Sequence, residues 1–124
     1  MTMDFTPLGP DAPLYAIKAN LFKALAHPVR IRVLEVLAEH GSVTMSALVT
    51  ETAFDEDTLV PQLAVLRRHG AAVAERRDED VTYRIAHPRI GELLQVAKAF
   101  LNDTASRATP PERPRLRSVP DRQD

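Results

Sequence analysis

The stretch Asp55–Gly70, DEDTLVPQLAVLRRHG, decides the fold of this chain of 124 residues. Its acidic start suits the N-terminus of a helix, and glycine commonly follows the last residue of one. In between, Leu59, Leu63 and Leu66 recur at the spacing of one helical face. The stretch therefore predicts an amphipathic helix with a buried leucine face and a solvent-facing side opposite to it.

A shorter helix is expected just before this stretch. Residues 45–50 have apolar positions at helical spacing, and either Ser42 or Thr44 can cap their start. Residues 51–54 then supply a turn. Two short helices joined by a turn, with the longer helix second, are typical of a helix-turn-helix. We therefore interpret Asp55–Gly70 as the recognition helix of a DNA-binding motif.

Two longer helices are expected earlier in the chain. Apolar residues recur at helical spacing over residues 14–26, and Pro28 should then break the chain and begin a new helix. That second helix, residues 28–39, carries apolar residues on more than one face, as a helix central to a core does. Residues 1–13 contain three prolines and no periodicity, so we expect a flexible arm.

Beyond the quoted stretch the apolar period falls towards two, which indicates strands. We predict a hairpin of about thirteen residues that ends at Ile85, with the polar turn Asp78–Asp80, and a break at His87–Pro88. A last amphipathic helix is expected over about residues 89–102. Residues 103–124 hold four prolines, five arginines and almost nothing apolar, so this tail is predicted to be disordered.

Composition narrows the class of protein. There is no cysteine, which excludes disulfides, thiolate metal sites and thiol-based redox sensing. No basic-then-apolar leader opens the chain and no apolar run reaches the roughly 18 residues that span a membrane, so we expect a soluble, cytoplasmic protein. The formal net charge is −1, so DNA binding must rely on local clusters of arginine.

The predicted order, mainly α with a small β-hairpin (α-α-α-α-β-β-α), is that of a winged helix-turn-helix. The segments LFKALAHPVRIRVLEVLAEHG (Leu21–Gly41), QLAVLRRHGAAV (Gln62–Val73) and VTYRI (Val81–Ile85) together resemble the ArsR/SmtB family of bacterial transcriptional regulators. The resemblance covers about residues 14–102, which we take as one DNA-binding and dimerisation domain. It implies a homodimeric repressor on a palindromic operator, with wings over the DNA backbone and release when an effector binds.

The first and last predicted helices each carry an apolar stripe that one small core has little room to bury. Surplus apolar surface favours pairing with a second copy, although both stripes could instead pack inside one monomer. The family resemblance implies the dimer. The predicted interface residues are Leu14, Ile17, Leu21, Leu93, Ala97, Phe100 and Leu101.

Reading the major groove requires polar side chains near the start of the recognition helix. Thr58 and Gln62 stand there, and motif matching to the family adds the neighbouring acids Glu56 and Asp57. Guanidinium groups suit the phosphate backbone, although each arginine could instead be solvated beside an acid. The predicted DNA-binding residues are Thr58, Gln62, Arg67, Arg76, Arg77 and Arg84.

Two features depart from the family. Pro61 lacks an N–H and disfavours a helix interior, so we expect the recognition helix to bend or to start late, with Asp57 or Thr58 as its cap. The acids Asp55, Glu56 and Asp57 lie where phosphates should approach. We therefore expect weak, salt-sensitive DNA binding unless a cation or a rearrangement intervenes.

Known members of the family often sense metals, through thiolates or through carboxylates and histidines on the last helix. Thiolates are excluded here, and only two of the four positions that match the second set can bind a metal. We therefore predict no cofactor and no family-type metal site, while a divalent metal effector at another site stays open. The four matching positions are His87, Arg89, Phe100 and Asp103.

No motif supports catalysis. We find no nucleophile elbow, no glycine-rich phosphate loop and no HExxH, so we expect no enzyme and assign no catalytic residues. The expected partners are double-stranded DNA and a second copy of the chain, with no membrane. A winged helix that binds a regulatory protein partner, or that needs a metal ion or such a partner to bind DNA, stays open as the alternative.

Overall fold

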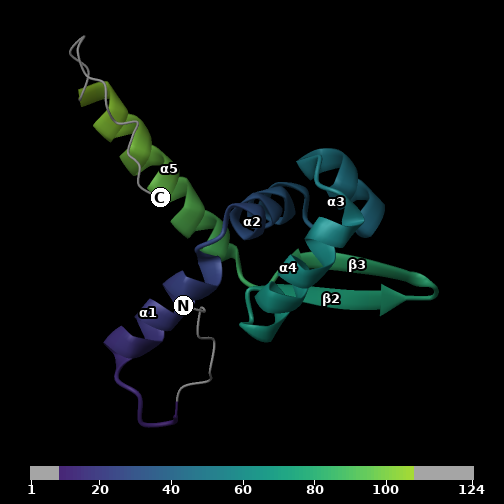
Figure 1. Cartoon of the computed structure of the whole chain (residues 1–124), viewed down its shortest axis with the longest axis horizontal. Helices are drawn as coiled ribbons and strands as arrows, with labels where there is room; N and C mark the ends of the chain where they lie inside the picture. Colours follow the sequence, from purple (N-terminus) through teal and green to yellow (C-terminus); the bar gives the residue numbers. More distant parts are fainter. Residues whose placement is uncertain (1–8, 108–124) are drawn as a thin grey trace. The chain divides into compact units, whose positions relative to one another are not determined.

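A computed structural model describes residues 9–107 of the chain (Figure 1). Residues 1–8 of the predicted arm and 108–124 of the predicted tail lie outside the described residues. Within the described part, no helix is long and apolar enough to cross a membrane. The elements are α1 (Leu14–Leu25), α2 (Pro28–His40), β1 (Val43–Thr44), α3 (Met45–Thr52), α4 (Glu56–Arg68), β2 (Ala72–Arg77), β3 (Asp80–Ile85) and α5 (Pro88–Arg107).

The chain divides after Gly91 into two compact parts. The first part runs from α1 to the first turn of α5, and it contains the helix-turn-helix and the sheet. The second part contains the remainder of α5. The helix continues to Arg107, five residues past its predicted end, so the first residues of the predicted tail are helical.

The core of the first part is built around α2. This helix packs against α3, α4 and β3, and its buried side chains lie on more than one face, as its sequence predicted. Fully burying a large aliphatic side chain contributes about 1.5–3 kcal/mol, so α2 supplies much of the stability of this part. The largest fully buried side chains are Leu34, Leu37, Leu48, Leu59, Leu66, Val33 and Val36.

Side-chain caps define the helix-turn-helix. The Thr44 hydroxyl accepts from the Ala47 N–H at 3.1 Å and begins α3, which decides between the two caps expected from the sequence. Ala53 ends α3 in the left-handed region, with φ of 65°. The Asp55 carboxylate then accepts from the Thr58 N–H at 2.9 Å and begins α4. The turn between the two helices is therefore short and closed at both ends.

A histidine followed by a proline begins two of the helices. The His27 Nδ1 accepts from the Val29 N–H at 3.1 Å, with Pro28 as the first residue of α2. The His87 Nδ1 accepts from the Arg89 N–H at the same distance at the start of α5. The break and restart at Pro28 were predicted. The imidazole caps were not, and an Nδ1 that accepts a hydrogen bond must be unprotonated.

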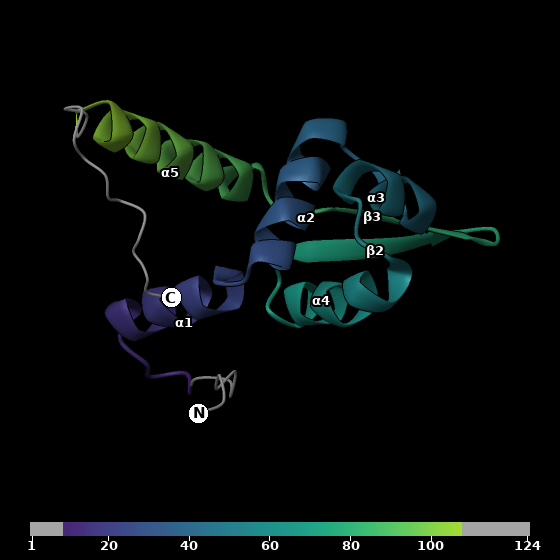
Figure 2. The same ribbon diagram turned by 45° about the horizontal axis from the view of Figure 1, so that its top comes forward.

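The sheet has three antiparallel strands in the order β1-β3-β2. The predicted hairpin is confirmed, with Ala72 opposite Ile85 and Arg77 opposite Asp80, and its tip projects beyond the helices (Figure 1 and Figure 2). Asp78 in the tip has a φ of 56°, a conformation that aspartate tolerates better than most residues. The third strand, β1, was not predicted, because two residues are too few to show a period.

The outer helices leave most of their apolar residues exposed. In α1 only Ala24 and Leu25 are buried, at the C-terminal end. In α5, Val96, Phe100 and Leu101 are each more than 60% exposed. The structure therefore agrees with the prediction that these two helices carry apolar residues that the core of one chain does not bury.

Candidate nucleic-acid interface

The recognition helix α4 has two faces of different character. Leu59, Leu63 and Leu66 are at most 2% exposed and pack into the core, as the spacing of the quoted stretch predicted. This packing fixes α4 against α2 and turns its other side to solvent. The exposed side consists of Glu56, Asp57, Val60, Pro61, Ala64, Arg67 and Arg68.

Pro61 lies inside α4, as its sixth residue. The expected late start of the helix is wrong, because Asp55 and not Asp57 or Thr58 supplies the cap. A proline at this position has no N–H for the Asp57 carbonyl, and an interior proline costs about 3 kcal/mol. The buried leucines and the cap together keep α4 helical through it.

The three acidic residues at the start of α4 have two different roles. Hydrogen bonds from the Thr58 side chain, and then from the Thr58 backbone, lower the pKa of the Asp55 carboxyl group. That carboxylate caps the helix, so it already accepts a hydrogen bond from the Thr58 N–H. Glu56 and Asp57 remain exposed in the first turn, where they suit the helix dipole but repel phosphate.

The two residues predicted to read bases lie at the edge of the exposed face. Thr58 is half-buried and is hydrogen-bonded to the Asp55 carboxylate. Gln62 is also half-buried, and its Oε1 is buried with no hydrogen-bond partner within residues 9–107. Bidentate contact with adenine would require Gln62 to rotate outward. Their role in base reading stays a prediction.

The four predicted backbone contacts differ in availability. Arg67 on α4, and Arg76 and Arg77 on β2, are exposed. The Arg84 Nε instead donates to the Glu75 Oε2 at 3.2 Å across the wing. Arg84 is thus beside an acid, the alternative that its sequence left open, although a surface pair contributes only about 0–1 kcal/mol.

Three basic residues come together at the C-terminal end of α4, namely Arg68, His69 and, from α2, Arg30. Arg30 is buried and its Nη1 donates to the Ala24 carbonyl at 2.8 Å, which fixes the end of α1 against the start of α2. Burial, and then the charge of Arg68, lower the pKa of Arg30. Burial, followed by Arg68 and Arg30, also lowers the pKa of His69. Sequence spacing gave no signal for this group, because the α2–α4 packing brings it together.

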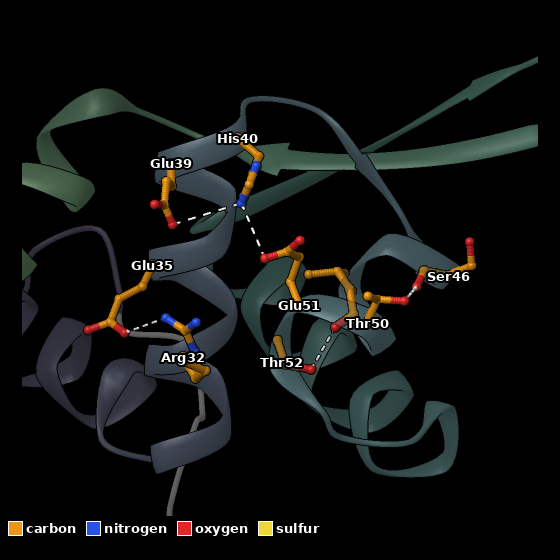
Figure 3. Close-up of polar contacts among 9 residues, drawn as sticks. Arg32, Glu35, Glu39, His40, Ser46, Thr50, Glu51 and Thr52 are labelled. Carbon is orange, nitrogen blue, oxygen red and sulfur yellow. Dashed lines mark hydrogen bonds and ion pairs between the residues drawn. The ribbon is translucent and has the colours of Figure 1, made fainter.

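Polar contacts also fix α3 beside α2 (Figure 3). The His40 Nε2, at the end of α2, lies 3.5 Å from the Glu51 Oε1 of α3 and 3.8 Å from the Glu39 Oε1. One turn further back, Arg32 and Glu35 form an ion pair of 3.2 Å along α2. The contact of His40 with Glu51 links the first helix of the motif to the central helix.

The positions that match the family's metal site carry a mixed set of side chains. The His87 Nδ1 already accepts from the Arg89 N–H, Arg89 is cationic, and Phe100 has no donor atom. Within residues 9–107, no cluster of three or more histidine, aspartate or glutamate side chains is arranged to hold a metal ion.

Similar proteins are transcriptional regulators, although no family model matches the chain. The HTH-type transcriptional regulator Rv0081 of Mycobacterium tuberculosis is 45% identical over 89 residues, which cover 72% of this chain and 78% of that protein. The Rv0081 crystal structure has a TM-score of 0.68 with 42% identity, covering 78% of this chain and 97% of that one. The transcriptional repressor BigR of Xylella fastidiosa has a TM-score of 0.65 with 29% identity, covering 69% and 87%.

A third solved structure shares the fold alone. The homodimeric winged helix-turn-helix domain Mb0332 of Mycobacterium bovis, a possible ArsR-family regulator, has a TM-score of 0.65 with 23% identity, covering 81% of this chain and 95% of that one.

The fold, the exposed face of α4 and these relatives define a DNA-binding winged helix-turn-helix regulator of transcription, and not an enzyme. The chain belongs to the ArsR/SmtB family of HTH-type transcriptional regulators. The fold class and the family expected from the sequence are therefore confirmed.

Proposed function

We propose that the protein is a homodimeric repressor that binds a two-fold symmetric operator. In each copy α4 enters a major groove, and the hairpin of β2 and β3 lies along the adjacent phosphates. The observation that carries this proposal is the orientation of α4, whose leucine face is held against α2 while the whole opposite face is open. Recognition helices enter the groove with such a face.

Two helices support the homodimer. In α1, Leu14 and Ile17 are 64% and 48% exposed, and in α5 Phe100 and Leu101 are 65% and 62% exposed. Of the other predicted interface residues, Leu21 and Ala97 are exposed and Leu93 is half-buried. Exposed apolar helix faces of this kind mark protein interfaces, and a second copy supplies matching faces by symmetry.

The direction of regulation follows from the relatives. BigR is a transcriptional repressor, and the biofilm growth-associated repressor of Xylella fastidiosa is 33% identical over 76 residues. We therefore propose repression, in which the dimer occupies an operator in the cytoplasm where chromosomal DNA is accessible. A dimer reading two half-sites places them about 34 Å apart, one turn of the double helix.

The first experiment is selection from a random duplex pool by the full-length protein at low salt. We expect a two-fold symmetric consensus with half-sites one helical turn apart, and binding that weakens with salt because the predicted contacts of the exposed Arg67, Arg76 and Arg77 are with phosphates. An asymmetric consensus would contradict the dimeric operator. A pool without enrichment would contradict DNA reading by the free protein.

The alternative of an activating ion or protein partner has its own result. It rests on the same exposed acids at the start of α4, which a divalent cation or a basic partner surface would neutralise. The selection is therefore repeated with Mg, Ni, Zn and Co ions. Enrichment only in the presence of one ion would replace free binding by metal-assisted binding.

The dimer is tested by charge substitutions on the outer helices. Ile17→Asp and Phe100→Asp place a charge on the exposed apolar faces of α1 and α5, so each should shift the protein to monomer in sedimentation velocity and abolish tight operator binding. Ala19→Asp is the matched control, because it makes the same kind of change on another exposed side of α1. A dimer that survives both interface variants would overturn the assignment of these helices.

A further inference from the structure

We propose that α4 reads its operator by apolar contact, with Val60 and Ala64 packed against the C5-methyl groups of thymines. This inference rests on the proposed function, since it requires α4 to lie in the major groove. It assigns base reading to the centre of the exposed face and not to Thr58 and Gln62 at its edge.

The exposure of Val60 is the first observation. Among the large hydrophobic side chains of residues 9–107, those exposed lie on α1 and α5, with the sole exception of Val60, which is 49% exposed on α4. Ala64 lies one turn further along and Pro61 beside both, and all three are exposed. An apolar patch therefore occupies the middle of the face that enters the groove.

The chemistry of the surrounding groups is the second observation. Val60 and Ala64 have no polar side-chain atom, Pro61 has no N–H, and the Thr58 side chain is hydrogen-bonded to the Asp55 carboxylate. The three residues at the centre of the face therefore offer no donor for the N7 and O6 acceptors of guanine. In the major groove, the thymine methyl is the apolar group that an aliphatic side chain can contact.

The spacing of charge along α4 favours DNA as the occupant of this patch. Arg67 lies seven residues after Val60, about 10 Å along the helix axis. The major groove is about 12 Å wide. With Val60 at the base edges, Arg67 and the neighbouring Arg68 are within reach of the phosphates at the groove wall, where their charge is complementary.

An acceptor lies beside the apolar patch. The exposed Asp57 is in the first turn of α4, three residues before Val60. Its carboxylate suits the amino groups of adenine and cytosine. The half-sites should therefore combine thymines with adenine or cytosine amino groups at neighbouring positions of the same groove.

The test uses the duplex selected from the random pool. Each thymine of a half-site is replaced in turn by deoxyuridine, which removes the methyl group and leaves the base pairing unchanged. Burial of one methyl contributes about fourfold in affinity, so loss of one per half-site should weaken wild-type binding about 15-fold. The same replacement outside the half-sites is the DNA control.

Two protein variants separate methyl contact from other effects. Val60→Ala should bind the thymine and deoxyuridine duplexes with nearly equal affinity, because it no longer reaches the methyl group. Arg77→Ala should weaken both duplexes alike and keep the wild-type ratio, since a phosphate contact is independent of the methyl. Thermal unfolding of both variants confirms that they fold.

Each remaining outcome overturns a defined statement. Equal wild-type affinity for the two duplexes, or a ratio that Val60→Ala leaves unchanged, overturns methyl reading while the dimeric operator stands. A consensus without a fixed thymine in each half-site does the same. A pool from which nothing is retained overturns the proposed function and this inference with it.

Discussion

The central part of the chain, from α2 to β3, and the two outer helices use similar apolar residues in opposite ways. In α2, Val33, Leu34, Val36 and Leu37 are fully buried, whereas Phe100 in α5 is 65% exposed. The periodicity is helical in each case. The difference teaches that an apolar stripe shows which side of a helix packs, but not whether the surface it packs on belongs to the same chain.

The sharpest way to break this comparison is to truncate one side chain of each kind. Leu34→Ala removes a fully buried side chain and should lower the free energy of unfolding by about 2–5 kcal/mol. Phe100→Ala should cost less, and its effect should depend on protein concentration because it weakens association and not the core. Urea unfolding at two protein concentrations a hundredfold apart measures both. Equal, concentration-independent losses would show that α5 is stabilised within one chain.

A substitution at Pro61 measures how much this proline lowers the stability of α4 within the central part. Pro61→Ala restores an N–H to the Asp57 carbonyl inside the helix, so it should raise the free energy of unfolding by about 1–3 kcal/mol. Denaturant titration measures the gain. Absence of any gain would mean that the surrounding packing has already adapted to the proline. Leu34→Ala in the same assay sets the scale for a buried change.

The joint between α1 and α2 lies where the two kinds of region meet. His27→Ala removes the cap of α2 and should cost about 1 kcal/mol, whereas His27→Asn keeps a capping oxygen and should cost less. Thermal unfolding at pH 7.5 compares the two variants. Identical losses would show that the imidazole contributes by packing and not by its hydrogen bond.

The same joint gives a dependence on pH. Burial and then Arg30 lower the pKa of His27 below its ordinary value of about 6.5, so below that pH the unfolded chain binds a proton that the folded chain does not. Stability should therefore fall as the pH drops from 7.5 through 6.5 towards the lower folded pKa. His27→Asn should flatten this fall, leaving the contribution of His69, whose pKa is lowered too.

The smallest effect is expected on the surface of the wing. Glu75→Gln breaks the pair with Arg84 and should change the free energy of unfolding by less than about 1 kcal/mol. If the freed guanidinium reaches a phosphate, the slope of log affinity against log salt should steepen by about one. An unchanged slope would place Arg84 away from DNA.

The sequence predicted the elements whose signals are local. The leucine spacing of α4, the Pro28 start of α2 and the alternation of the hairpin each depend on near neighbours, and these three features are where they were expected. Strand β1 was missed because two residues show no alternation. The extension of α5 to Arg107 was missed because residues 103–107 are polar and show no apolar period.

The candidate site was less accessible to sequence reasoning than the fold. Thr58 and Gln62 were chosen by residue type, yet the angle of each around α4 depends on how the leucines dock, and that packing buries the Gln62 Oε1. Val60 has the residue type of a core position, so its exposure could not be read from the pattern. The pairing of Arg84 with Glu75 depends on the register of two strands.

The charge of the wing has a consequence for how the regulator finds its site in a genome. Between Ala72 and Ile85 there are four carboxylates and three guanidinium groups, one of them paired with Glu75. Non-specific affinity depends on cationic contacts with phosphate, so random chromosomal DNA should retain little of this protein. Most copies would then be free in solution, and operator occupancy would follow the number of molecules in the cell closely.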